Sequence, residues 1–280
     1  MFLLIISSFG TGCIKRDTLE DITIYTTSYP IEYITSILYG EHSSIYSIYP
    51  NGIENNNYQL NEIQIKEYSK TDMYVFNGLS SEKDYLTSMI KYNNDLMIID
   101  ATNTMEYTYS EEELWLDPSN FLMMALNIKN GLTEYITNHY LKEEINENYN
   151  NIKIEISNID ANLKLLSENV SSTTIVVDNN VFKYLEKYGF TIISLDEKTV
   201  TNKIIADVNN LISSGKIKYI FTIDKDNLND DVQDLIDSTN IQILEFDKIS
   251  NLTDEQRSNK ETYISILNNN INLIKTELYD

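Results

Sequence analysis

The chain has 280 residues, of which 42% are hydrophobic, and its formal net charge is −22. The apolar content excludes a largely disordered protein, and the length predicts two lobes or domains rather than one ordinary core. A surface this acidic repels phosphate backbones, which argues against nucleic acid as a partner. Two histidines and one cysteine exclude disulfides, zinc fingers, iron–sulfur clusters and most histidine-based catalysis.

The N-terminal stretch, residues 1–12, is apolar or small and leads directly to the single cysteine, Cys13. As a helix it would rise about 18 Å, too short for a bilayer core of about 30 Å but suitable for the apolar region of an export signal. Small residues before one cysteine resemble the lipobox of bacterial lipoproteins, which implies cleavage before Cys13 and lipid attachment to it. The alternative is a structural cysteine in a buried segment. No later stretch reaches 18 apolar residues, so we expect the remaining chain to lie outside the bilayer.

Short apolar strands alternate with helices in the first part of the chain, which predicts a parallel sheet covered on both faces. Ile31, Ile34 and Leu38 recur at helical spacing up to Gly40, and Ser81 with Asp84 predicts a capping box. The strands are expected at Ile22–Thr26, Ser44–Tyr49, Met73–Phe76 and Leu96–Ile99, and two further helices at Asn61–Ser69 and Ser81–Tyr92.

The same alternation returns late in the chain and predicts a second α/β lobe, again with about four parallel strands. Strands are expected at Thr174–Val177, Thr191–Leu195, Ile217–Ile223 and Ile241–Phe246. Helices are expected at Asn180–Tyr188, Thr199–Ser213, Asp230–Asp237 and Glu261–Leu278.

A long amphipathic stretch separates the two lobes. Its apolar residues recur at spacings of three or four and comprise Leu141, Ile145, Tyr149, Ile152, Ile156, Ile159, Leu163 and Leu166. About 28 residues of helix would span about 42 Å, enough to run the height of both lobes. A coiled-coil dimer would use the same stripe, but we favour one intramolecular strut in a monomer. The predicted divisions are a signal peptide at 1–12, an N-terminal lobe at 13–138, a linker helix at 139–170 and a C-terminal lobe at 171–280.

Ligands of parallel α/β sheets bind outside the carboxyl ends of the strands, and in a two-lobe protein those ends face one cleft. This rule selects four segments. They are Pro50–Gln59, Tyr107–Pro118, Asp178 with Asn179, and Asp247.

The same segments resemble a known family. The motifs are Tyr25-Thr-Thr-Ser-Tyr-Pro-Ile, Ile48-Tyr-Pro-Asn-Gly, Val75-Phe-Asn-Gly-Leu, Trp115-Leu-Asp-Pro, Phe182-Lys-Tyr-Leu-Glu-Lys-Tyr-Gly and Thr262-Tyr-Ile-Ser-Ile-Leu-Asn-Asn-Asn. In this order they are similar to the zinc- and manganese-binding solute-binding lipoproteins of bacterial ABC importers. The resemblance implies two α/β lobes joined by a long helix, with one divalent metal ion held between them as cargo. It also implies an ABC permease and its ATPase as partners, and a lipid-anchored position at the cell surface.

The resemblance also implies where the metal ligands fall, although most of the family's histidines are replaced. The corresponding positions are Asn56, Glu113, Asn179 and Asp247. Glu54 and Asp178 are nearby substitutes. Such a set offers only oxygens, which suit Mn²⁺, Ca²⁺ or Mg²⁺ better than Zn²⁺. The affinity for zinc is therefore expected to be reduced, altered or lost.

Each of these residues also has a structural interpretation. Asn179 can cap the following helix, Asp247 can be a turn residue, and Glu113 belongs to an acidic loop. No Ser-His-Asp set and no glycine-rich phosphate loop is present, so we expect binding rather than an enzyme. The competing hypotheses are a family member without metal that acts in interaction or adhesion, and a receptor for another solute.

Overall fold

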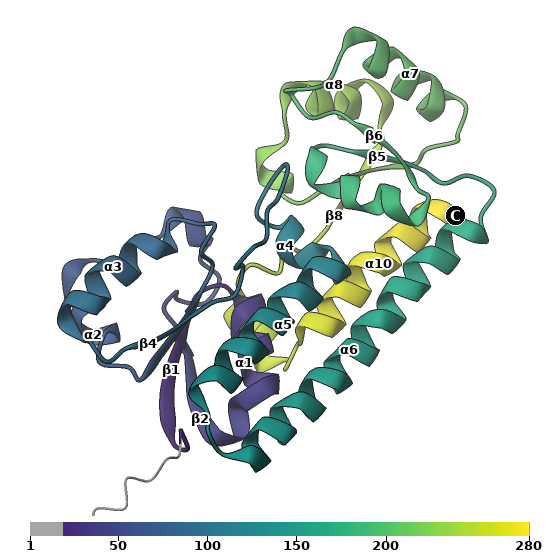
Figure 1. Cartoon of the computed structure of the whole chain (residues 1–280). Helices are drawn as coiled ribbons and strands as arrows, with labels where there is room; N and C mark the ends of the chain where they lie inside the picture. The colour runs from purple at the N-terminus through teal and green to yellow at the C-terminus, as the bar shows by residue number, and fades with distance from the viewer. Residues whose placement is uncertain (1–18, 280) are drawn as a thin grey trace, which may run out of the picture.

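The structure is a computed structural model that describes residues 19–279. The predicted signal peptide and the predicted lipidation site Cys13 lie outside the described residues. Figure 1 shows two α/β lobes connected by a layer of long helices. This arrangement confirms the predicted fold class. In the part of the chain that the structure describes, no helix combines the length and the apolar character needed to cross a membrane.

The first lobe is built on a four-stranded parallel sheet with the order β2-β1-β3-β4. Its strands are β1 (Ile22–Thr26), β2 (Ser43–Ser47), β3 (Met73–Phe76) and β4 (Met97–Asp100). Every residue of β3 is buried, and its side chains alternate between two apolar clusters on opposite faces of the sheet. Such burial on both faces is why β3 is a continuous apolar run in the sequence.

Helices cover both faces of this sheet. Those of the lobe are α1 (Tyr29–Tyr39), η1 (Gly40–His42), η2 (Asn55–Asn57), α2 (Glu62–Tyr68) and α3 (Glu82–Tyr92). The capping box predicted at Ser81 is wrong. Ser81 has helical backbone angles and makes no capping hydrogen bond, whereas the hydroxyl of Ser80 accepts the N–H of Glu82 at 3.1 Å. A reciprocal capping box instead begins α2, between Asn61 and Gln64.

The second lobe repeats the topology of the first, with strand order β6-β5-β7-β8. Its strands are β5 (Thr174–Val177), β6 (Thr191–Ser194), β7 (Tyr219–Thr222) and β8 (Gln242–Glu245). Its helices are η3 (Asn180–Tyr188), α7 (Asn202–Ser213), η4 (Lys225–Asn227) and α8 (Asp230–Thr239). The short helix α9 (Asp254–Ser258) follows β8 but contacts the first lobe, where Arg257 binds Glu32 of α1. The predicted helix at Asn180–Tyr188 is present but has 3₁₀ geometry. Because side chains three residues apart align in a 3₁₀ helix, Phe182, Leu185 and Tyr188 are all buried on one side.

The long helix between the lobes is α6 (His139–Glu168), and it lies beside α5 (Pro118–Tyr135) and α10 (Tyr263–Tyr279) in Figure 1. Its apolar stripe is buried within the chain, with Tyr149 half-buried, so the stripe is used as an intramolecular strut. The helix α5 is not among the elements predicted from the sequence. This helix packs closely on β4, because Gly131 leaves room for Ile99 where a Cβ atom would lie 2.8 Å from its side chain.

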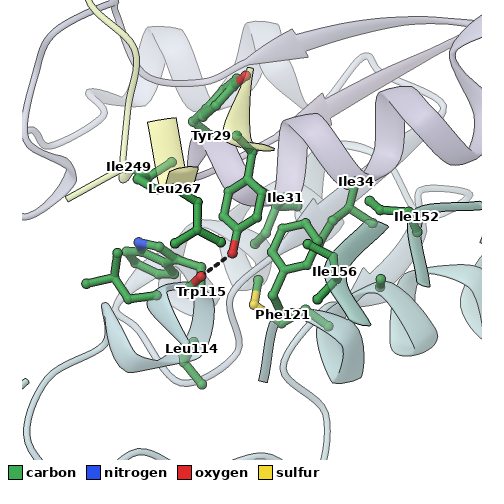
Figure 2. Close-up of a cluster of buried hydrophobic side chains, with 14 of the residues drawn as sticks. Tyr29, Ile31, Ile34, Leu114, Trp115, Phe121, Ile152, Ile156, Ile249 and Leu267 are labelled. Carbon is green, nitrogen blue, oxygen red and sulfur yellow. Dashed lines mark hydrogen bonds between the residues drawn. The ribbon is translucent and has the colours of Figure 1, made fainter. Parts of the chain in front are cut away.

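A single apolar cluster continues from the first lobe through the long helices into the second lobe. Figure 2 shows its centre, where the side chain of Trp115, from the short helix α4 (Glu113–Leu116), lies beside Ile249 and Leu267. The ring of Phe121 stacks on Tyr263 with their centroids 3.9 Å apart, and the Tyr263 hydroxyl donates to the carbonyl of Trp115. The indole N–H of Trp115 donates to the carbonyl of Lys248, 2.7 Å away and after the last strand of the second lobe. The two lobes are therefore joined by packing and not only by chain connections.

Truncation of the buried face of α6 should destabilise the whole protein. Ile152 and Ile156 are almost fully buried, so Ile152→Ala and Ile156→Ala should each lower the free energy of unfolding by about 2–4 kcal/mol. Ile154→Ala is the matched control, because the Ile154 side chain lies on the same helix and is 61% exposed. Chemical denaturation monitored by circular dichroism measures all three. Equal losses from Ile154→Ala and Ile156→Ala would contradict the burial of this face.

Candidate functional site

Two adjoining pockets lie between the lobes at the carboxyl ends of the strands, and we call them together the interlobe cleft. The larger has a volume of about 560 Å³ and the smaller about 310 Å³. The larger is lined by five carboxylates, namely Glu54, Asp224, Asp226, Glu245 and Asp247. The smaller is lined by Glu112, Asp178, Asp196, Glu197 and again Asp224. Asp224 and Lys248 line both pockets, so the two form one continuous site.

The charge of the cleft is strongly negative. Nine carboxylates line it, whereas the lysines among its lining residues are Lys198 and Lys248. Carboxylates crowded along a concave surface raise the local concentration of cations and repel anions. The cleft is therefore suited to a cationic solute and unsuited to phosphate, nucleotides or organic acids.

Asp247 is the predicted ligand that the structure places most clearly in the cleft, where it lines the larger pocket. Its Oδ1 accepts the backbone N–H of Ile249 at 2.7 Å, which is the turn predicted for this residue. Its Oδ2 accepts the side-chain amide of Gln256 at 2.6 Å. Asn270 of α10 also binds the backbone N–H and carbonyl of Asp247 at 2.9 Å each. The carboxylate is thus held in one orientation by neighbouring donors.

Glu113 is held by its own loop. Its carboxylate accepts three backbone N–H groups, from Thr108 at 3.2 Å, Tyr109 at 2.6 Å and Ser110 at 3.0 Å. It is not among the residues that line either pocket, whereas its neighbour Glu112 lines the smaller one. The visible role of Glu113 is to stabilise the loop between β4 and α4.

The two predicted asparagine ligands lie in different parts of the cleft region. Asn179 lines the smaller pocket and caps η3, because its Oδ1 accepts the N–H of Val181 at 2.9 Å. Asn56 lies in η2, and its side chain is outside what the structure describes. Its neighbours Glu54 and Asn57 line the larger pocket. The structure therefore brings Asp247 and Asn179 to one cleft and does not bring Glu113 there.

Lys248 crosses the cleft between the lobes. Its ammonium nitrogen Nζ lies 3.3 Å from Oε1 of Glu54 in the first lobe and 3.2 Å from Oδ2 of Asp224 after β7. Burial acts to lower the pKa of Lys248, but the two carboxylates outweigh it and the pKa is raised. Burial likewise acts to raise the pKa of Asp224, yet hydrogen bonds from Asn227 and Lys248 give a net lowering. Both residues are therefore charged at neutral pH.

Sequence reasoning missed Asp224 and Lys248. The strand-tip rule, applied also to the third strand of the second lobe, would have selected Asp224. The ion pair of Lys248 with Glu54 joins residues 194 positions apart, and no local pattern indicates it.

Two buried carboxyl groups, Asp178 in the wall of the smaller pocket and Glu82 at the start of α3, have raised pKa values. Burial raises the pKa of Asp178 to about 6, opposed by a hydrogen bond from Thr222. Burial raises the pKa of Glu82 in the first lobe to about 7, although Asn77 N–H and the Tyr49 hydroxyl donate to it at 3.0 and 3.2 Å. These two groups have the most strongly perturbed carboxyl pKa values that the structure gives.

The side chains do not form a ready-made metal site. Within the described residues, no three His, Cys, Asp or Glu side chains are arranged to hold one ion. Neither histidine lines the cleft. His42 lies 3.0 Å from the carboxylate of Glu144 on α6, and His139 is exposed beside Glu143. Any cation bound in the cleft would therefore require carboxylates to move toward it.

Two α/β lobes facing each other across a polar cleft, with a long helix along both, define the class of two-lobe solute-binding proteins. The family model described as zinc-uptake complex component A, periplasmic, matches residues 24–277, so the chain belongs to this family of metal-importer binding proteins. This result confirms the family indicated by the sequence motifs.

Individual relatives are more distant. The chain is 24% identical over 214 residues to the manganese-binding lipoprotein MntA of Halalkalibacterium halodurans, covering 70% of this chain and 69% of that protein. It is 25% identical over 221 residues to the iron-binding protein YfeA of Yersinia pestis, covering 74% and 70%. Among solved structures, the zinc-bound ZnuA-like domain of Streptococcus pneumoniae AdcA superposes with a TM-score of 0.74 at 18% identity, covering 93% of this chain and all of that domain.

Replacement of Glu82 should change how stability depends on pH. The pKa of Glu82 is raised in the fold from 4.5 to about 7, so between these pH values the folded protein holds a proton that the unfolded chain has released. Stability is then lost as the pH rises through this window, by on the order of 3 kcal/mol in total. Glu82→Gln should remove this loss, so the melting temperature of the wild type should fall relative to the variant between pH 5 and 8.

Thermal denaturation across this pH range is the measurement. Glu41→Gln, which makes the same change at an exposed residue, is the control and should follow the wild type. Parallel curves for Glu82→Gln and the wild type would show that Glu82 is not protonated in the folded protein.

Proposed function

We propose that this protein is the cargo receptor of a metal-type ABC importer and that its cargo is a divalent cation bound in the interlobe cleft. On this proposal the chain is anchored outside the membrane by lipid on Cys13. It delivers the cation to a permease driven by an ATPase, and it catalyses no reaction. Family membership supports the class of importer.

The observation that carries the proposal is the lining of the cleft. The strand ends of both lobes contribute carboxylates, with Glu54 from the first lobe and Asp224 and Asp247 from the second lining the same pocket. Oxygen ligands from two lobes can enclose one cation as the side chains converge, and carboxylates at this density favour a divalent ion over a monovalent one.

The donor atoms indicate which cation is favoured. The cleft offers carboxylate and amide oxygens, and both histidines lie elsewhere. Zn²⁺ sites in proteins rely on imidazole and thiolate, whereas Mn²⁺, Ca²⁺ and Mg²⁺ are bound by oxygens. We therefore propose Mn²⁺ ahead of Zn²⁺ as the cargo.

The ligand roles of Asn56, Glu113, Asn179 and Asp247 stay predictions. Asp247 is the best placed of the four, and we propose that Glu54 and Asp224 act with it. Glu113 would have to release three backbone N–H groups before it could bind a cation. A family member without metal, acting in adhesion, and a receptor for another solute are the rival hypotheses, and the anionic cleft argues against an anionic solute.

Loss of the Asp247 charge should weaken cation binding. Asn is nearly isosteric and its oxygen can still accept the Ile249 N–H, although the Gln256 amide loses its acceptor, so Asp247→Asn should keep the fold and lower the association constant for Mn²⁺ at least tenfold. Isothermal titration of chelator-treated protein with Mn²⁺, Zn²⁺, Ca²⁺ and Mg²⁺ measures this, with elemental analysis of the purified protein beside it. Asp234→Asn, at an exposed residue of α8, is the charge-matched control and should bind like the wild type.

Titration heats and melting temperatures that respond to none of the four cations would overturn the proposed cargo. Tighter binding of Zn²⁺ than of Mn²⁺ would keep the receptor function but contradict the assignment of the cation.

A further inference from the structure

We propose that Lys248 is an internal cation of the interlobe cleft, whose ammonium group must leave Glu54 and Asp224 before the cargo is coordinated. This inference rests on the proposed function, because it concerns the order of events in the same cleft. It makes Lys248 a residue that determines which cations can load.

The position of the ammonium group carries the inference. Nζ lies within 3.3 Å of a carboxylate oxygen from each lobe, and the Lys248 side chain is 19% exposed. It contacts two of the carboxylates that we propose as cargo ligands, and it lines both pockets of the cleft. The other lysine of the cleft, Lys198, is exposed and no ion pair is recorded for it within the described residues.

Lys248 and its two carboxylate partners form an ion-pair bridge between the lobes. The loop that carries the first-lobe partner, Glu54, is held by the chain segment that carries Lys248. The side-chain amide of Asn251 donates to the carbonyls of Pro50 and Ile53, at 2.7 and 2.9 Å, and so fixes the loop that leads to Glu54. The backbone of Lys248 itself is fixed by the indole N–H of Trp115. The lysine therefore projects from an anchored backbone toward an anchored loop.

The second-lobe end is also positioned. The backbone N–H of Asp224 donates to the hydroxyl of Thr222 at 2.9 Å. Its Oδ2, which accepts from Lys248, also accepts the side-chain amide of Asn227 at 3.0 Å. Because Asp224 is held by Thr222 and Asn227, whereas the ammonium group ends a long flexible stem, the ammonium group leaves first and the carboxylates then converge on the cargo. A long flexible lysine stem can swing its charged end into water without moving the backbone.

The charges of Lys248, Glu54 and Asp224 explain why the cleft would select divalent over monovalent cations. An ammonium group supplies one positive charge to two carboxylates, so a monovalent cation that replaced it would gain no charge and would lose a tethered partner. A divalent cation supplies twice the charge from a smaller volume and can contact both carboxylates together with Asp247. Lys248 should therefore exclude Na⁺ and K⁺, and it should weaken the binding of every divalent ion by competition.

The first test measures the exposure of individual lysines by acylation. The full chain is treated with an amine-reactive ester, and mass spectrometry gives the acylation rate of each lysine with and without saturating Mn²⁺. We expect Lys248 to react at least tenfold more slowly than Lys198 in the cation-free protein and to accelerate severalfold when Mn²⁺ is added. Glu54→Gln, which removes one partner of the ammonium, should accelerate the reaction of Lys248 without any cation.

The second test compares two charge-matched variants by titration with Mn²⁺. Lys248→Met should raise the association constant at least tenfold, because the competing ammonium is gone. Lys198→Met removes the same charge from the lining of the smaller pocket and should change the constant less than threefold. The difference between them separates competition at the site from a general change of electrostatic potential.

The outcomes distinguish this inference from the proposed function. Mn²⁺ binding by the wild type with Lys248 still protected, or equal gains in the two variants, would overturn the inference and leave the receptor function intact. Binding by Lys248→Met alone would support the inference and contradict the cargo proposed for the wild type. If the wild type and Lys248→Met both fail to bind any cation, both proposals are overturned.

Discussion

The apolar core that runs through the junction of the lobes is the constraint on which the rest of the structure depends. Trp115 is almost fully buried at its centre, and Tyr263 and Phe121 stack beside it from α10 and α5. A large hinge motion between the lobes would expose this core to water at a cost of about 25 cal/mol per Å² of apolar surface. The two sets of strand ends are therefore held facing each other, and cargo can enter only through movements of loops and side chains.

This fixed frame concentrates negative charge in a small volume. Both lobes have the same strand order, and each contains a buried carboxyl group with a raised pKa, Glu82 in the first lobe and Asp178 in the second. Burial raises the pKa of both groups because the charged form is separated from water. The carboxylates of the cleft also repel one another, and Lys248 neutralises part of their charge through its ion pairs with Glu54 and Asp224. A divalent cation from solution would neutralise the same carboxylates with twice the charge of the ammonium group.

Hydrophobic patterns in the sequence predict the strands and helices that bury a whole face. They do not predict features that depend on close packing or on contacts between residues far apart in the chain. Met73–Phe76 was recognised because both of its faces are covered, and α6 because its stripe repeats at helical spacing. The helix α5 is not among the predicted elements, and its close contact with β4, where Gly131 meets Ile99, is a packing feature that no local pattern indicates. The capping box predicted at Ser81 is wrong because the neighbouring Ser80 accepts the Glu82 N–H, and a local pattern cannot distinguish two adjacent serines. For the site, strand-end geometry indicated Asp247 and Asn179, but the Lys248–Glu54 pair joins distant parts of the chain.

The hydrogen bonds of the predicted ligands show why a family pattern alone does not settle a binding site. Glu113 accepts backbone N–H groups of the loop before α4, and Asn179 accepts one at the start of η3, so both already have partners that a cation would have to displace. Both oxygens of Asp247 also have partners, the N–H of Ile249 and the side-chain amide of Gln256, but Asp247 lines the larger pocket. A carboxylate oriented in this way by neighbouring donors resembles the outer-shell support of metal ligands more than a simple turn. The affinity of the cleft is therefore set less by the number of oxygens than by the strength with which each oxygen is already held, and Lys248 holds two further carboxylates, Glu54 and Asp224.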